Sequence, residues 1–224
     1  MKITKIELIP IDIPRKKVLT LAHYGNLGQG GNFEFVLVKV HTDEGITGVG
    51  EVPPLPPLSP ESQPVIIDVQ KKWLVPLLLG VDPFETEAIW ERMDFIAPTY
   101  TMAKAALDMA LWDIMGKTLG IPLHRLLGGS KPEKISNVGL IGVDEPEVVY
   151  KIATEFVEHG YTGIRLKIAP RHDVECVASV RDAIGPDVDL RVDCNQGYRV
   201  AEAVKMIRQI EPYGVEMVEQ PTAW

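Results

Sequence analysis

Three short apolar stretches, each ending in charged or polar residues, decide the fold of this chain. They read GIRLKI at residues 163–168, VDLRVDCN at residues 188–195 and VEMVEQP at residues 215–221. Stretches of helical length with amphipathic spacing separate them, so the order is strand, helix, strand, helix, strand. That order is typical of a parallel α/β sheet, and it predicts that the three carboxyl ends meet at one edge.

Side-chain alternation along these strands predicts which polar groups share a face. Because residues i and i+2 of a strand point the same way, Arg165 and Lys167 are expected on one face. Asp193 and Asn195 likewise share a face, while Cys194 points to the opposite one. Strands of parallel sheets are usually covered on both faces and read as nearly continuous apolar runs. Charged groups at these positions are therefore costly unless they bind each other or a ligand.

Together with Glu219, the strand ends carry two cations and two carboxylates. In α/β barrels the active site lies at the carboxyl ends of the strands. Two carboxylates that face two cations at such a mouth indicate a divalent metal beside a lysine base. Any one of these residues alone could as well be a solvated charge, since clustered charges are also structural. Their occurrence at the ends of successive strands favours the functional interpretation.

The composition, with 46% hydrophobic and 24% charged residues among 224, is that of a soluble globular protein of one or two domains. A net charge of −8 argues against a nucleic acid or an anionic membrane as partner. No apolar run reaches the roughly 18 residues that a membrane-spanning helix needs. The first residues lead into strand-like alternation without a signal peptide, and the two cysteines lack metal-type spacing. We therefore expect a cytoplasmic protein with buried free thiols.

A change of periodicity near residue 130 divides the chain into two predicted domains. Residues 1–130 read as an α+β domain, with antiparallel strands followed by helices. Its strands are predicted at 1–13, 33–40 and 46–52, and its helices at 62–79, 83–93 and 101–118. Residues 131–224 alternate strands at 138–143, 162–168, 188–194 and 215–219 with helices at 145–159, 171–184 and 199–212. The spacing of these four β units along the chain matches that of a (β/α)8 barrel. They would form its first half, strands 1–4.

Two loops and one helix of the first domain carry further signals. A glycine-rich loop at residues 18–32 fits a mobile lid in which His23 and Tyr24 contact substrate. A plain surface connection is the alternative interpretation of that loop. A stiff proline-rich stretch follows at residues 53–60. In the helix at 101–118 small alanines lie on the apolar stripe, which predicts very close packing on that face.

Four motifs of this chain, taken in order, resemble those of one enzyme family. They are AKAALDMALWD at residues 103–113, RLK at 165–167, DCN at 193–195 and EQP at 219–221. The set is similar to the signature of the mandelate racemase/muconate lactonizing enzymes of the enolase superfamily. The resemblance covers essentially the whole chain.

The resemblance implies an α+β capping domain over a (β/α)8-type barrel that binds one Mg²⁺, with Mn²⁺ as an alternative metal. It implies that Lys167 removes the proton α to a substrate carboxylate, and that Asp193 and Glu219 bind the metal that stabilises the enediolate. Asn195 is implied to contact the ligands or the substrate, with Arg165 as the catalytic cation beside the base. Such a carbon acid is very weak, and its deprotonation adds negative charge to the carboxylate. A fixed positive charge stabilises that added charge.

Two features depart from the family pattern. Arg165 stands where the pattern usually has lysine, which leaves Lys167 as the expected base. The family's third acidic ligand and a later acid/base residue belong to strands beyond Trp224, so we expect an incomplete chain with four of eight strands. Such a chain would bind metal weakly, catalyse poorly and cover its open edges as a homo-oligomer.

The predicted function is that of an isomerase or lyase of the muconate cycloisomerase, racemase or epimerase type, acting on a small carboxylate substrate. The alternative is a catalytically silent fragment that serves as an assembly or interaction module. The intact Lys167, Asp193 and Glu219 favour the enzyme, whereas the absent third ligand favours the module. The residues leave the reaction open among cycloisomerisation, racemisation, dipeptide epimerisation, acid-sugar dehydration and o-succinylbenzoate synthesis.

Overall fold

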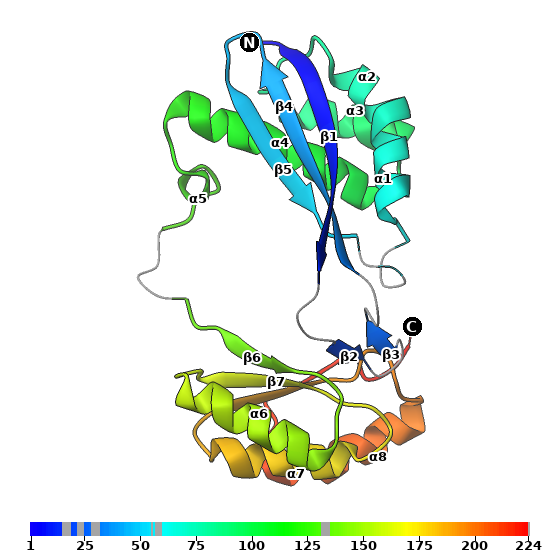
Figure 1. The fold of residues 1–224 in the computed structure, drawn as a ribbon, viewed down its shortest axis with the longest axis vertical. Coiled ribbons are helices and arrows are strands. Elements are labelled where there is room, and N and C mark those ends of the chain that lie inside the picture. The colour runs from blue at the N-terminus through cyan, green and yellow to red at the C-terminus, as the bar shows by residue number, and fades with distance from the viewer. Residues whose placement is uncertain are drawn as a thin grey trace. The chain divides into compact units, whose positions relative to one another are not determined.

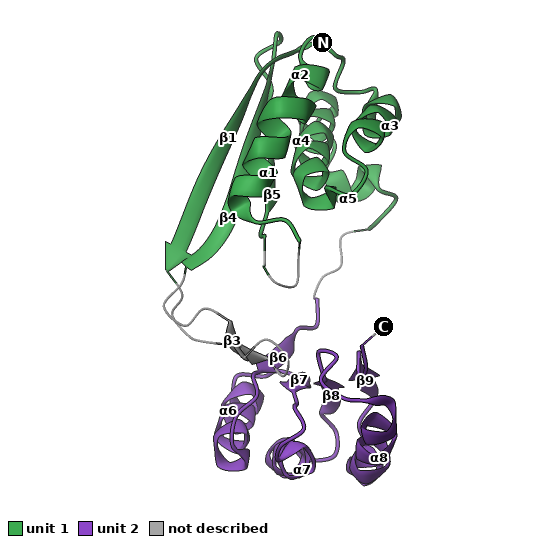
Figure 2. Ribbon diagram, turned by 90° about the vertical axis from the view of Figure 1, so that its right-hand side faces the viewer, with its two compact units in different colours: residues 1–15, 31–132 green, residues 16–30, 133–224 purple. Residues whose placement is uncertain are grey.

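The chain forms two compact units, residues 1–15 with 31–132 and residues 16–30 with 133–224 (Figure 2). The structure is a computed structural model and describes residues 1–14, 19–21, 25–27, 32–54, 56, 60–130 and 135–223. For residues 19–21 and 25–27 it describes the backbone alone. Each unit has its own buried apolar core. None of the described helices has the length and apolar composition needed to cross a membrane.

The first unit is built on an antiparallel sheet in the order β1-β4-β5 (Figure 1). Its strands are β1 (Ile3–Pro14), β4 (Asn32–Thr42) and β5 (Thr47–Val52). Valines at positions 36, 38 and 40 of β4 all point into the core, as the two-residue period of a strand requires. The hairpin predicted between residues 33 and 52 is confirmed.

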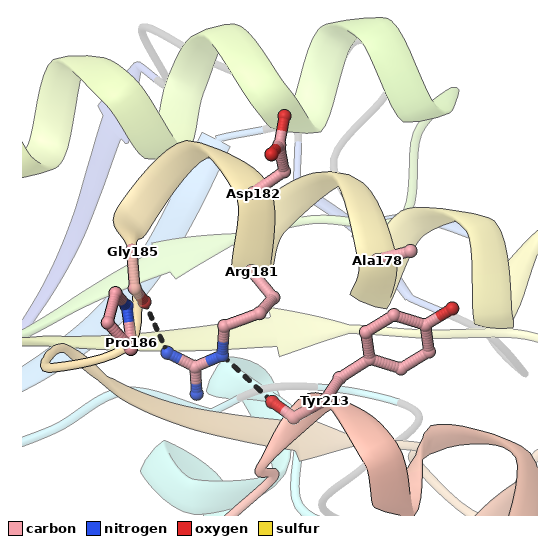
Figure 3. Close-up of a pocket in the computed structure, with 6 residues that line it drawn as sticks. All are labelled: Ala178, Arg181, Asp182, Gly185, Pro186 and Tyr213. Atoms are coloured by element: carbon pink, nitrogen blue, oxygen red, sulfur yellow. Dashed lines mark hydrogen bonds between the residues drawn. The ribbon is translucent and has the colours of Figure 1, made fainter.

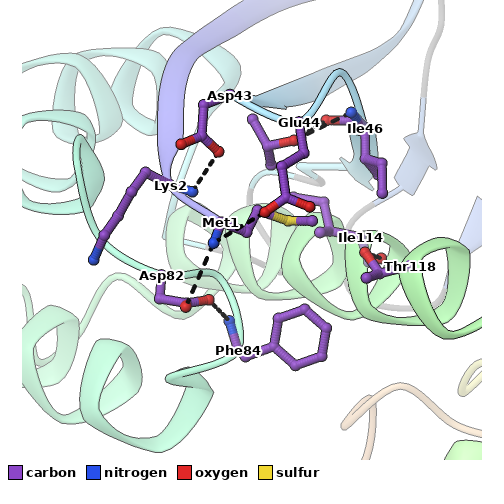
Figure 4. Close-up of polar contacts among 10 residues, drawn as sticks. Met1, Lys2, Asp43, Glu44, Ile46, Asp82, Phe84, Ile114 and Thr118 are labelled. Atoms are coloured by element: carbon purple, nitrogen blue, oxygen red, sulfur yellow. Dashed lines mark hydrogen bonds and ion pairs between the residues drawn. The ribbon is translucent and has the colours of Figure 1, made fainter.

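Polar contacts fasten the β4–β5 turn to the start of β1 (Figure 4). The amino group of Met1 pairs with the Glu44 carboxylate at 3.2 Å, and this hydrogen bond raises the pKa of the amino group. The Lys2 N–H donates to the Asp43 carboxylate at 2.7 Å. The turn that joins β4 and β5 is thus held at Asp43 and Glu44 by the two residues that precede β1.

The helices of the first unit follow the predicted order, with one short helix, α5, added and two of the predicted helices altered. They are α1 (Gln63–Val69), the π-helical η1 (Gln70–Leu74), α2 (Val75–Leu78), α3 (Thr86–Ile96), α4 (Thr101–Leu119) and α5 (Leu123–Leu126). The helix predicted at 62–79 therefore contains a π-helical turn. The helix predicted at 83–93 spans 86–96 instead, and its start is later because Asp82 holds the chain in a turn. Its carboxylate accepts the Phe84 N–H at 3.0 Å and its carbonyl oxygen accepts the Glu85 N–H at 3.1 Å.

Helix α4 lies so close to β5 that two positions of the strand have no room for a side chain. A Cβ atom on Gly48 would lie 2.0 Å from the Ala110 carbonyl oxygen, and one on Gly50 would lie 1.8 Å from that of Ala106. The close packing predicted from the alanine stripe is confirmed. The start of α4 is capped from a distance, since buried Glu61 accepts two N–H groups of its first turn at 2.8 and 2.9 Å.

The second unit contains a parallel sheet in the order β6-β7-β8-β9, with helices α6, α7 and α8 along one face (Figure 2). The elements are β6 (Val138–Ile141), α6 (Pro146–Glu158), β7 (Gly163–Lys167), α7 (Asp173–Ile184), β8 (Asp189–Asp193), α8 (Val200–Ile210), the 3₁₀ helix η2 (Glu211–Tyr213) and β9 (Met217–Glu219). All four predicted strands are present and parallel. This arrangement is consistent with part of a (β/α)8 barrel.

A further two-stranded antiparallel sheet joins β2 (Leu19–Leu21) and β3 (Gly25–Leu27). The sequence predicts only loop here, because three-residue strands are too short to show alternation. The rest of the glycine-rich loop, with His23 and Tyr24, lies outside the described residues, as does part of the proline-rich stretch at 53–60.

Arg181 braces the amino ends of β8 and β9. Its guanidinium donates to four carbonyl oxygens, those of Gly185, Val188, Tyr213 and Gly214, at distances of 2.7 to 3.0 Å. Figure 3 shows the arginine between Gly185 and Tyr213, in an open pocket on the surface. This pocket lies at the amino ends of the strands, opposite to the predicted site.

Candidate active site

The register of three strands places a lysine and two carboxylates in one row. Lys167 ends β7 and pairs with Asp193, which ends β8 and pairs in turn with Glu219 at the end of β9. Adjacent strands are about 4.8 Å apart, so side chains of such a row on one face can touch. The expectation that the carboxyl ends of these strands meet at one edge is confirmed.

The lysine of this row is buried and hydrogen-bonded to two side chains. Lys167 is 7% exposed, and its Nζ lies 2.5 Å from the Asp193 Oδ2 and 2.9 Å from the Asn195 Oδ1. Asp193 is 0% exposed, and its other oxygen accepts the Asn195 N–H at 2.9 Å. A buried charge is tolerated only with a partner and hydrogen bonds, and both charges of this pair have them.

Arg165 links the two carboxylates. Its guanidinium lies 2.5 Å from an oxygen of Asp193 and 2.5 Å from an oxygen of Glu219. The Arg165 side chain is 31% exposed and that of Glu219 is 34% exposed, so this side of the row reaches solvent. The Arg165 Nε–H is buried and has no hydrogen-bond partner among the described residues. The site therefore keeps one donor that no described residue uses.

The apolar face of the same strands points to the helices. Ile164, Leu166, Leu190 and Val192 are fully buried in the second core, and Cys194 joins them. The alternation predicted for these strands is confirmed, with charged groups on one face and apolar groups with the thiol on the other.

The residues that follow two of these strands, β8 and β9, have strained backbone conformations. Asn195, Gln196 and Gln220 all have positive φ angles, of 43°, 65° and 40°. Residues with a side chain rarely adopt this left-handed conformation, and such strain persists where the surroundings enforce it, often at functional sites. The two turns that follow the carboxylates are therefore held by their surroundings.

The donor set fits a Mg²⁺ ion. Asp193 and Glu219 offer oxygen atoms from adjacent strands, and oxygen is the ligand type that Mg²⁺ prefers. Within the described ranges no group of three or more His, Cys, Asp or Glu side chains suited to a metal is found. Mg²⁺ is commonly bound by one or two carboxylates, with waters and substrate oxygens as its other ligands.

The sequence did not single out two residues beside the row, Tyr198 and Asp173. Tyr198 is 6% exposed and its hydroxyl donates to the Asp173 carboxylate at 2.8 Å. Burial raises the pKa of the Tyr198 hydroxyl, and the hydrogen bond to Asp173 raises it further. A buried tyrosine usually has a partner for its hydroxyl, but the spacing of these two residues, 25 positions apart, gives no signal for the pair.

Both parts of the chain match known family models. Residues 23–128 match the mandelate racemase/muconate lactonizing enzyme N-terminal domain, and residues 148–224 match the enolase C-terminal domain-like model. The chain belongs to the mandelate racemase/muconate lactonizing enzyme family. The resemblance carried by the four sequence motifs is thereby confirmed.

Curated members of the family are similar over nearly the whole chain. A hydrophobic dipeptide epimerase of Enterococcus faecalis is 34% identical over 223 residues, which are 99% of this chain and 61% of the relative. An N-succinyl-L-Arg/Lys racemase of Bacillus cereus is 32% identical over 224 residues, 99% of this chain and 60% of the relative. The chain thus spans about 60% of the length of these family members.

Solved structures of the family share the fold. The N-succinyl Arg/Lys racemase from Bacillus cereus has a TM-score of 0.93 at 32% identity, over all of this chain and 60% of the other. The dipeptide epimerase from Enterococcus faecalis, complexed with Mg and the dipeptide L-Leu-L-Tyr, has a TM-score of 0.92 at 32% identity, over all of this chain and 62% of the other.

Proposed function

We propose that this chain carries half of the active site of a Mg²⁺-dependent racemase or epimerase that acts on N-acylated amino acids or dipeptides. The observation that carries the proposal is the row of Lys167, Asp193 and Glu219 across three parallel strands. Dipeptide epimerases and an N-succinylamino acid racemase at 32 to 34% identity support this reaction type, and a muconate lactonizing enzyme at 32% identity makes cycloisomerisation the second candidate. The first unit would serve as the capping domain, and the second as the first four βα units of a barrel.

In this proposal Lys167 is the base. Its Nζ lone pair takes the proton from the α-carbon, the C–H electron pair moves toward the carboxylate, and the amine becomes an ammonium. An ammonium at this position is stabilised by the contacts of Lys167 with Asp193 and Asn195. Return of the proton from the same face gives exchange with solvent, and inversion requires an acid on the other face.

Asp193 and Glu219 would hold the Mg²⁺ ion, which supplies positive charge where the substrate carboxylate becomes more negative. Arg165 would keep a permanent cation beside the base, because a guanidinium stays charged at any ordinary pH. Its forked donors also match a carboxylate, and its buried Nε–H, which has no partner among the described residues, could donate to a substrate oxygen. We expect Arg165 to orient the substrate rather than to exchange protons.

The test is exchange of the substrate α-proton with solvent deuterium, followed by NMR on the whole protein with Mg²⁺ and a panel of dipeptides and N-succinylamino acids. We expect exchange with the wild type, none with Lys167→Ala, and wild-type rates with Lys151→Ala. Lys151 is a matched control because it is an exposed lysine on α6. Exchange that persists in Lys167→Ala would remove the lysine from its proposed role. A wild type without exchange on any carboxylate and without Mg²⁺ binding would favour the interaction module instead.

A further inference from the structure

Two strained turns follow the strands that carry the charged row. The first turn, residues 194–198, follows β8, and the second, residues 220–222, follows β9. Both contain left-handed residues that bear side chains, at 195, 196 and 220. None of these three positions holds glycine, and asparagine adopts such angles more readily than glutamine, so Gln196 and Gln220 in particular depend on contacts from elsewhere.

Backbone hydrogen bonds join the two turns into one unit. The N–H of Cys194 donates to the Glu219 carbonyl oxygen at 3.0 Å, and that of Gln196 donates to the Gln220 carbonyl oxygen at 2.8 Å. Tyr198 extends the series, since its N–H donates to the Pro221 carbonyl oxygen at 3.1 Å. It also forms an isolated parallel bridge with the residue that follows that proline. The parallel ladder thus continues past the ends of β8 and β9 as far as Tyr198.

Tyr198 is the residue that anchors this unit to the helical layer. Its side chain is buried in the second core, and its hydroxyl donates to Asp173 at 2.8 Å. Asp173 is the first residue of α7, where a negative charge is stabilised by the helix N-terminus. The acceptor is therefore a fixed carboxylate on a rigid element rather than a mobile loop residue.

We propose that Tyr198 is a positioning residue, whose hydrogen bond to Asp173 holds Asn195 and Glu219 at the distances that the site needs. Through the first turn it sets Asn195, whose amide oxygen contacts Lys167 and whose N–H contacts Asp193. Through the second turn it sets the backbone of Glu219. The inference rests on the proposed function as far as metal binding is concerned, and on the structure alone for the coupling of the two turns.

The test compares Tyr198→Phe with Tyr213→Phe in the whole protein. Tyr213 is a matched control: it packs against the same core, and its hydroxyl makes no hydrogen bond within the described part of the chain (Figure 3). Two quantities are measured, the Mg²⁺ dissociation constant by titration calorimetry and hydrogen exchange of backbone amides by mass spectrometry. Removing a group that orients metal ligands typically lowers metal affinity by 10- to 100-fold.

For Tyr198→Phe we expect at least a tenfold weaker Mg²⁺ complex and faster exchange in residues 194–198, with Tyr213→Phe unchanged in both. A Tyr198→Phe protein that melts earlier but binds Mg²⁺ as tightly as the wild type would reduce Tyr198 to a stabilising residue and overturn the inference. If Tyr198→Phe fails to fold, Asp173→Ala, which removes the acceptor, should reproduce both effects. If the wild type binds no Mg²⁺, the proposed function fails, and hydrogen exchange still decides whether Tyr198 holds the turns.

Discussion

Removal of Asp193 tests whether the charged row is as tightly interdependent as its contacts indicate. Asp193 is fully buried and serves two cations and one backbone N–H at once. In an Asp193→Ala protein, Lys167 keeps only the amide oxygen of Asn195 as an acceptor among its contacts in this structure. Arg165 keeps its ion pair with Glu219, and its side chain, which is 31% exposed, is partly hydrated.

The expected loss of stability in the Asp193→Ala protein follows from the burial of its ion pairs. Removing one partner of a buried ion pair leaves an uncompensated charge and typically costs about 3–5 kcal/mol. Glu219 provides the internal comparison, because it makes one ion pair with the same arginine and is 34% exposed. Exposed pairs contribute about 0–1 kcal/mol, so Glu219→Ala should cost no more than about 1 kcal/mol.

The assay is urea unfolding followed by circular dichroism in the absence of added metal, on wild type, Asp193→Ala and Glu219→Ala. We expect the free energy of unfolding to fall by about 3–5 kcal/mol in Asp193→Ala and by at most about 1 kcal/mol in Glu219→Ala. Equal losses in the two variants would refute the reasoning, because they would mean that burial does not distinguish the two carboxylates.

Two further predictions concern packing and the thiols. Gly50→Ala places a Cβ atom 1.8 Å from the Ala106 carbonyl oxygen, so we expect about 1–3 kcal/mol of destabilisation by overpacking, measured by the same urea unfolding. Burial raises the pKa of the Cys176 thiol to about 11 and that of the Cys194 thiol to about 12, so neither should react with a disulfide reagent at pH 8 before unfolding. Because these folded-state pKa values lie above the usual value of 9.0, their contribution to stability is present below pH 9 and is lost as the pH rises toward 12. A native protein whose thiols react rapidly, or whose stability is constant from pH 9 to 11, would contradict this account of the second core.

The parallel strands and the charged row could be predicted because their signals are local. Alternation along a strand decides which side chains share a face, and parallel strands bring their carboxyl ends together whatever the loops do. That is sufficient to place Lys167 near Asp193 and to send Cys194 into the core. The stripe of alanines on α4 likewise predicts a close contact before the contacting strand is known.

Other features depend on contacts between distant residues and leave no such pattern. The turn that delays α3 depends on one carboxylate, that of Asp82, and the π-helical segment interrupts an unchanged apolar spacing. Glu61 caps α4 from about 40 residues away in the chain. The anchoring of Tyr198 on Asp173 requires the order of the helices around the sheet, which spacing alone does not provide.

The most direct test of the central claim is the rate of α-proton exchange as a function of Mg²⁺ concentration, for wild type, Glu219→Gln and Glu216→Gln. Glu219 ends β9 and Glu216 directly precedes that strand, but Glu216 is an exposed residue paired with Arg191, outside the row. If the three strand ends form one metal-assisted site for proton abstraction, exchange by the wild type and by Glu216→Gln saturates at the same Mg²⁺ concentration. Glu219→Gln then needs at least about ten times more Mg²⁺. Exchange that is independent of Mg²⁺, or equal in the two variants, would contradict the claim.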